Sequence, residues 1–227
     1  MAQDRSDYLG HRQRLRERLL SGGGKALADY ELLEFLLCQA QPRGDMKPVA
    51  KLLIREFGSF AGVMTAAPDE LRRIDGIGEA SVAALKAVQE SALRIAHHEI
   101  KGREVVGSWR KLLDYCRTAL AAEKTEQFHL LFLDAKNAVI KDEAQSRGTI
   151  NHTPVYAREV VKRALELGAA AIIMVHNHPS GDPTPSEDDI AMTREVAAAA
   201  AKLGIALHDH VIVAGGEHSS FRALGLL

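Results

Sequence analysis

This 227-residue sequence has only two cysteines, no long apolar run and no excess of one charge, and each of these features excludes a class of protein. The two cysteines, Cys38 and Cys116, lie far apart, which excludes a disulfide framework and a cysteine-rich metal site. Any metal must therefore be held by histidine and carboxylate side chains. The longest apolar stretches, such as residues 169–175, are far shorter than the roughly 18 to 20 residues that span a bilayer. The shortness of these stretches and the highly charged N-terminus together predict a cytoplasmic protein without a membrane partner.

Charge is balanced across the chain. Lysine and arginine number 29 against 30 aspartates and glutamates, and residues 1–100 are balanced as well. Overall electrostatics therefore gives no reason to expect a nucleic-acid partner. What is present is 46% hydrophobic and 26% charged residues, the composition of an ordinary globular protein, in a chain long enough for two modest domains.

Residues 30–98 carry a helical pattern. Apolar side chains cluster at positions 32–37 and return at helix-like spacing through 49–57, with Gly44 and Gly58 among the breaks. This pattern predicts a small all-helical domain over residues 1–102.

After residue 102, strand signals alternate with helices. The apolar segment 128–133, its hairpin partner 138–141, and the runs 169–175 and 206–213 are the expected strands. Helices are expected over 103–120, 157–167 and 186–203, and the last two end at Gly168 and Gly204. The alternation of strands with helices predicts an α/β domain over residues 103–227.

A candidate metal site follows the strand at 169–175. Because side chains alternate with period two along a strand, His176 and His178 are expected to point to the same side. A loop with three prolines then leads to Asp189 in the first turn of the next helix. Two imidazoles and one carboxylate with a vacant fourth position form the ligand set of a catalytic zinc.

Each of these residues also has a simpler explanation. A lone His-x-His at a strand end is weak support for a metal. Ser186 and Asp189 fit a capping box, with the serine at the N-cap and the aspartate three residues later. The two interpretations are compatible, because a capping serine keeps its hydroxyl proton and a carboxylate has a second oxygen.

The complete spacing is specific. His-x-His, seven residues, Ser, two residues and Asp is the JAMM signature, and the string HNHPSGDPTPS at 176–186 resembles the RadC family of bacterial proteins, historically labelled DNA repair proteins. The resemblance implies a JAB/MPN-like domain, a mixed sheet flanked by helices in cytidine-deaminase-like layers, preceded by a helix-hairpin-helix domain. It also implies one Zn²⁺ per chain and a metalloprotease or isopeptidase activity on a peptide or protein substrate.

The resemblance also assigns roles. His176, His178 and Asp189 become metal ligands, and Ser186 becomes the group that stabilises the tetrahedral oxyanion. JAMM enzymes use a glutamate at the start of an upstream strand as general base, and Glu126 occupies the matching place.

Two other glutamates compete for the base role. Glu143 and Glu159 are each near the end of an expected element, so sequence distance does not exclude them, and a site without any base is the remaining alternative. Glu159 is more simply a first-turn carboxylate favoured by the helix dipole.

A second His-x-His, His208 and His210, has no carboxylate at ligand spacing. It is interpreted as ordinary strand-end histidines, with a supporting position beside the zinc as the alternative.

The N-terminal domain contains a possible DNA contact. Residues 69–86 follow the pattern helix, apolar-x-Gly-apolar-Gly, helix, which resembles a helix-hairpin-helix with Gly76, Ile77 and Gly78 in the turn. In that motif backbone N–H groups bind a DNA phosphate, and Lys86 would add a positive charge. The alternative is a plain turn between helices.

Charges near the hairpin support both interpretations. An arginine cluster near the N-terminus favours DNA, although it fits a solvated, partly disordered tail equally well. Asp75 and Glu79 flank the hairpin and would repel phosphate. The cluster consists of Arg12, Arg14, Arg16 and Arg18.

Three functions remain open from the sequence. The first is a zinc-dependent hydrolase that acts near DNA. The second is a non-catalytic DNA-binding or recombination and repair accessory protein in which the metal is structural. A nuclease is the third, although a single His₂Asp site lacks the paired-metal carboxylates common in enzymes that cleave phosphodiesters.

Overall fold

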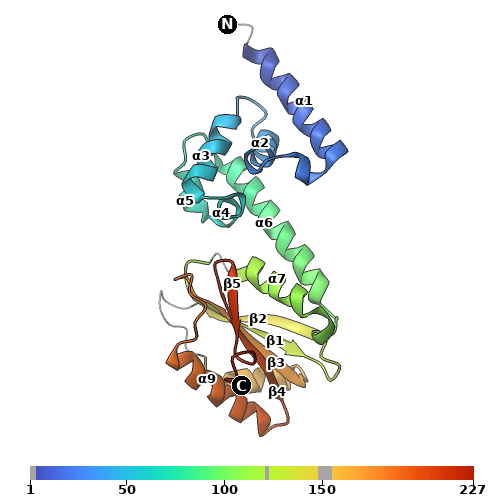
Figure 1. The fold of residues 1–227 in the computed structure, drawn as a ribbon, viewed down its shortest axis with the longest axis vertical. Coiled ribbons are helices and arrows are strands. Elements are labelled where there is room, and N and C mark those ends of the chain that lie inside the picture. The colour runs from blue at the N-terminus through green and yellow to red at the C-terminus, as the bar shows by residue number, and fades with distance from the viewer. Residues whose placement is uncertain (1–3, 121–122, 148–154) are drawn as a thin grey trace. The chain divides into compact units, whose positions relative to one another are not determined.

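The structure, a computed structural model, describes residues 4–120, 123–147 and 155–227. The chain divides into two compact units, residues 1–91 and 92–227, and each is considered by itself. Figure 1 shows helices in the first unit and a sheet with flanking helices in the second. The division lies within helix α6, whereas the domain border predicted at residue 102 lies just past the end of that helix and stays a prediction.

The first unit is all-helical, as predicted. The long helix α1 (Asp4–Gly22) precedes the region where helices were expected. The other elements are η1 (Gly24–Ala26), α2 (Asp29–Ala40), α3 (Lys47–Phe57), α4 (Phe60–Thr65), α5 (Pro68–Arg72) and the first part of α6 (Glu79–Ile100). Gly58 ends α3 in a left-handed conformation, and Ser59 caps α4 by accepting the Gly62 N–H. Leu33, Leu37 and Leu53 are among the buried residues of its core.

The second unit contains a mixed five-stranded sheet. Its strands are β1 (Gln127–Leu133), β2 (Val139–Arg147), β3 (Ala171–Asn177), β4 (Ala206–Ala214) and β5 (Glu217–Ser220), in the order β2-β1-β3-β4-β5. Only β3 and β4 among these neighbouring pairs are parallel. The four longer strands match the predicted ones, and β5, a short edge strand, was not predicted.

Helices cover both faces of this sheet (Figure 1). The 3₁₀ helix η2 (Val106–Ser108) leads into α7 (Trp109–Leu120), which packs on one face, while α8 (Ala157–Glu166) and α9 (Glu187–Ala201) pack on the other. Alternation decides which residue faces which layer. In β3, Ile173 and Val175 belong to the core under α7, and Ile172 and Met174 belong to the core under α8 and α9. This is the predicted α/β arrangement of a mixed sheet between helices.

Cys38 and Cys116 are both buried free thiols. No helix within the described ranges combines the length and the apolar character of a bilayer span.

Candidate metal centre

His176 and His178 meet at the carboxyl end of β3. Ile172, Met174 and His176 alternate along β3 and point to the same side. His176 therefore faces the layer formed by α8 and α9. His178 lies one residue beyond the strand, where its backbone N–H bonds to the carbonyl of Val213. The two Nε2 atoms are 2.9 Å apart, so both imidazoles point to the same side, as predicted.

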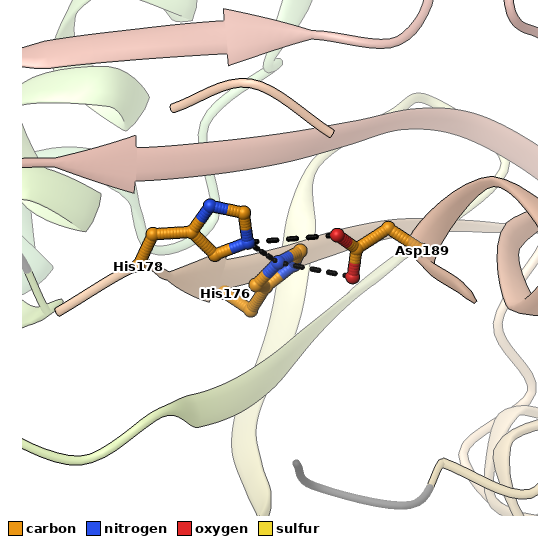
Figure 2. Close-up of side chains that lie close together, drawn as sticks. All are labelled: His176, His178 and Asp189. Atoms are coloured by element: carbon orange, nitrogen blue, oxygen red, sulfur yellow. Dashed lines mark hydrogen bonds and ion pairs between the residues drawn. The ribbon is translucent and has the colours of Figure 1, made fainter. Parts of the chain in front are cut away.

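Asp189 reaches these histidines from the first turn of α9. Ser186 caps that helix, because its Oγ accepts the Asp189 N–H while the Asp189 carboxylate accepts the Ser186 N–H. The predicted capping box is thus present. Asp189 Oδ1 lies 3.3 Å from His176 Nε2 and Oδ2 lies 3.5 Å from His178 Nε2 (Figure 2).

The spacing of these atoms fits a small tetrahedral cation. Bonds of about 2.0–2.1 Å to a tetrahedral zinc separate its ligand atoms by about 3.3 Å. The three separations here are 2.9, 3.3 and 3.5 Å. His176, His178 and Asp189 can therefore hold a metal ion with their side chains nearly where they stand.

The loop between the ligands is tied down at several points. Thr184 N–H bonds to Asp182 Oδ1 at 2.9 Å, and Ser219 Oγ on β5 donates to the carbonyl of Pro183 at 2.6 Å. The second contact ties the proline-containing loop to the sheet. The two candidate ligands His178 and Asp189 therefore lie at opposite ends of a constrained segment.

Hydrogen bonds fix the proton position on His178. Its Nδ1 lies 2.8 Å from the carbonyl oxygen of Asp182, and a carbonyl can only accept. Nδ1 must therefore carry the proton, and the neutral ring has its lone pair on Nε2, toward His176 and Asp189. Metal-binding histidines are commonly oriented by such a bond to the other ring nitrogen.

A buried chain of hydrogen bonds fixes His176 in the same way. Thr193 Oγ1 donates to the backbone carbonyl of Asp189 at 2.6 Å, so it accepts from His210 Nδ1, also at 2.6 Å. His210 Nε2 is then an acceptor, and it lies 2.8 Å from His176 Nδ1. His176 donates from Nδ1 and keeps its Nε2 lone pair for a metal. Stacking of His176 on Phe128 and of His210 on Phe221 supports the two rings.

The pKa shifts agree with this arrangement. Burial lowers the pKa of His176 to about 4, so this imidazole is neutral near pH 7. The hydrogen bond to Asp189 raises the pKa of His178, and the charge of Glu126 adds to that effect. Burial alone would raise the pKa of Asp189. The effect of burial is outweighed by hydrogen bonds from His178 and Ser186 and by the electrostatic effect of His176, so the pKa is lowered. A carboxylate and two inward lone pairs form a site that favours a cation.

The three candidate glutamates have different surroundings. Glu126, directly before β1, acts electrostatically on His178. Glu143 on β2 is instead held by two hydrogen bonds from Arg163, at 2.8 and 2.6 Å, which lower its pKa. Glu159 bonds to its neighbour Arg158 in the first turn of α8. Glu126 thus interacts with a candidate ligand, and its role as the base stays a prediction.

Ser186 lies against the candidate ligand Asp189. Its Oγ donates to Asp189 Oδ2 at 2.5 Å while accepting the Asp189 N–H. The hydroxyl is therefore next to the candidate metal position, as the JAMM role requires, but its proton is engaged in this structure.

The second His-x-His divides into two different environments. His210 is fully buried and bonds to His176, so the alternative interpretation, a position beside the site, holds for it. His208 bonds to Asn137 Oδ1 at 2.6 Å.

The contact of Thr193 with His210 was not anticipated from the sequence. The position of Thr193 four residues after Asp189, on the same face of an alanine-rich helix, was the available signal.

A turn joins α5 and α6 in the first unit, as both interpretations of residues 69–86 require. Gly76 has a φ of +87°, and a Cβ there would lie 2.9 Å from Val49 Cγ2, so both conformation and space require glycine. Ile77 is buried in the helical core, while Gly78 immediately precedes α6. Lys86 Nζ donates to the carbonyl of Met64 at 2.7 Å. DNA contact through this hairpin stays a prediction.

The basic cluster lies on a helix rather than on a disordered tail. Arg12 in α1 donates to the carbonyls of Pro42 and Gly44, and Arg18 pairs with Glu31 at 2.7 Å. At the hairpin, Arg72 pairs with Glu79 at 2.6 Å. These cations thus make contacts within the unit.

Comparisons with known proteins agree with the two-part organisation. The family described as a RadC-like JAB domain matches residues 106–226, and the family described as UPF0758 N-terminal matches residues 8–83. A UPF0758 protein of Rhodobacter capsulatus is 57% identical over 213 residues, which cover 94% of this chain and 100% of the relative. A UPF0758 protein of Ruegeria pomeroyi is 53% identical over 217 residues, which cover 96% of this chain and 97% of the relative.

Proposed function

Because this chain belongs to the RadC family, whose members carry a RadC-like JAB domain, we propose that it is a zinc-dependent hydrolase of amide or isopeptide bonds. One zinc ion per chain would be held by His176, His178 and Asp189. The substrate class is a peptide or a protein. The proposal goes beyond the family relationship, because the names of the relatives state no activity.

One observation carries the proposal. Hydrogen bonds at both Nδ1 atoms leave the Nε2 lone pairs of His176 and His178 facing the Asp189 carboxylate at distances suited to a tetrahedral ion. Three protein ligands leave a fourth position for water or substrate, which is the arrangement of catalytic rather than structural zinc. In the part of the chain that the structure describes, this group has three members.

Zinc bound there would make a coordinated water acidic and polarise the scissile carbonyl. Glu126 would accept the proton as the water oxygen attacks the carbonyl carbon. The same carboxyl would return that proton to the amine nitrogen as the C–N bond breaks, so the peptide and one water become an acid and an amine. Ser186 would turn its hydroxyl from Asp189 toward the developing oxyanion.

The test compares the unmodified protein with His178→Ala and Glu126→Gln. Bound zinc is measured by elemental analysis, and cleavage is measured on a fluorogenic peptide library and on a peptide branched through a lysine Nε. We expect His178→Ala to lose both metal and cleavage, and Glu126→Gln to keep the metal but lose cleavage by at least about a hundredfold. Zinc binding without cleavage in the unmodified protein would favour the accessory-protein function instead.

A further inference from the structure

Asn177 separates the two candidate ligands in sequence and lies on the other side of the sheet. By the alternation of β3 it belongs with Ile173 and Val175, which pack under α7. Its side chain is 1% exposed. A buried position in such a strand is ordinarily filled by an aliphatic residue, so an amide there requires polar partners.

The side chain of Asn177 bonds to the segment just before and at the start of β1. Its Oδ1 accepts the Gln127 N–H at 2.8 Å. Its Nδ2 donates to the carbonyls of Glu123 and Thr125, both at 3.1 Å. Both amide protons are thus used, and the bonds flank Glu126 on either side.

These bonds continue the contact between β1 and β3 beyond the last backbone pair of these two strands. The pairing of β1 with β3 ends at Phe128 opposite His176. One residue further along, the side chain of Asn177 takes the Gln127 N–H. The segment that carries Glu126 is therefore attached to the strand that carries the ligands.

We infer that Asn177 is a positioning residue, whose amide holds residues 123–127 so that the Glu126 carboxylate stays beside His178. The inference rests on the proposed function, in which Glu126 is the base. A displacement of about 1 Å at a catalytic group can cost about a hundredfold in rate. The side chain of one residue between two ligands would thus couple the base to the metal site.

The first measurement is amide exchange at Gln127 in the zinc-loaded full chain. Asn177→Ala should raise the exchange rate at Gln127 about tenfold or more, because the buried acceptor is lost. Zinc affinity should change by less than about threefold, since the hydrogen bonds of both ligand histidines remain. Asn177→Ser, which removes less volume, replaces the alanine variant if the latter does not fold. Unchanged exchange at Gln127 would overturn the inference, and so would loss of zinc comparable to that of a ligand variant.

The second measurement needs no substrate. Acetohydroxamate chelates zinc and binds more tightly when a carboxylate accepts its N–OH proton, so its Kd reports where Glu126 lies. We expect Asn177→Ala and Glu126→Gln each to weaken it about tenfold, and the double variant to be no worse than Glu126→Gln alone. Additive losses, or no loss in either single variant, would overturn the inference.

Val175→Ala is the matched control. Val175 is fully buried on the same face of the same strand, so this variant weakens the core without removing a bond to residues 123–127. It should leave Gln127 exchange and acetohydroxamate affinity near those of the unmodified protein. If the unmodified protein cleaves no peptide but the coupling is found, the hydrolase assignment fails and the positioning role of Asn177 stands.

Discussion

Replacing His210 by leucine should weaken zinc binding although His210 is not a candidate ligand. Leucine fills a similar volume but cannot accept the His176 Nδ1–H, which lies 2.8 Å from His210 Nε2. In the metal-free variant, His176 can move its proton to Nε2 and donate toward Asp189 Oδ1, 3.3 Å away. To bind zinc, His176 would have to return this proton to Nδ1, where the buried N–H would have no partner. The penalty therefore destabilises the zinc-bound state.

The size of that penalty follows from the burial of both imidazoles, each 0% exposed. An unsatisfied buried donor costs about 1–3 kcal/mol, and loss of such supporting bonds lowers metal affinity about 10- to 100-fold, or about 1.4–2.8 kcal/mol. The assay is competition for zinc with a chelating dye. His208→Leu is the control, because His208 bonds to Asn137 and should leave the Kd within about twofold. Unchanged affinity in His210→Leu, or equal losses in both variants, would show that the bond from His176 to His210 does not support zinc binding.

Two further predictions concern pH and the rival glutamate. The pKa of His178 is raised and that of His176 is about 4, so His178 is the ligand whose proton zinc must displace as the pH falls. Zinc affinity should therefore fall about tenfold per unit as pH drops through the raised pKa, beginning above the ordinary value of about 6.5. A slope of two protons in chelator titrations from about pH 8 to pH 5 would contradict this. Glu143→Gln should lower the free energy of unfolding by only about 0.5–1 kcal/mol in urea titrations, since the pair with Arg163 is partly exposed, and should leave cleavage unchanged. A loss equal to that of Glu126→Gln would assign the base to Glu143.

Local patterns were enough to predict most of the fold. Alternation along 169–178 correctly placed both histidines on one side, and the capping box correctly placed Asp189 beside Ser186. Gly168 and Gly204 have positive φ and follow the ends of α8 and α9, where glycines were expected. The edge strand β5 carried too few residues to produce a period-two signal. Helix α1 begins well before the helical pattern that starts at residue 30.

The surroundings of the site were much harder to predict, because they depend on tertiary contacts. Nothing in the spacing of His208 and His210 distinguishes them. A register shift between β3 and β4 places His210 opposite Met174, on the face that carries His176. The sequence around Asn177 likewise gives no sign of its hydrogen bonds. They depend on a segment about fifty residues earlier in the chain.

A structure of the zinc-loaded protein would distinguish a catalytic from a structural metal site. We expect the ion on His176 Nε2, His178 Nε2 and Asp189 at about 2.0–2.2 Å, with solvent in the fourth position. That solvent molecule should lie within about 3.2 Å of the Glu126 carboxylate. A fourth protein ligand, or Glu126 turned away from the ion, would contradict a catalytic site and point to a structural metal.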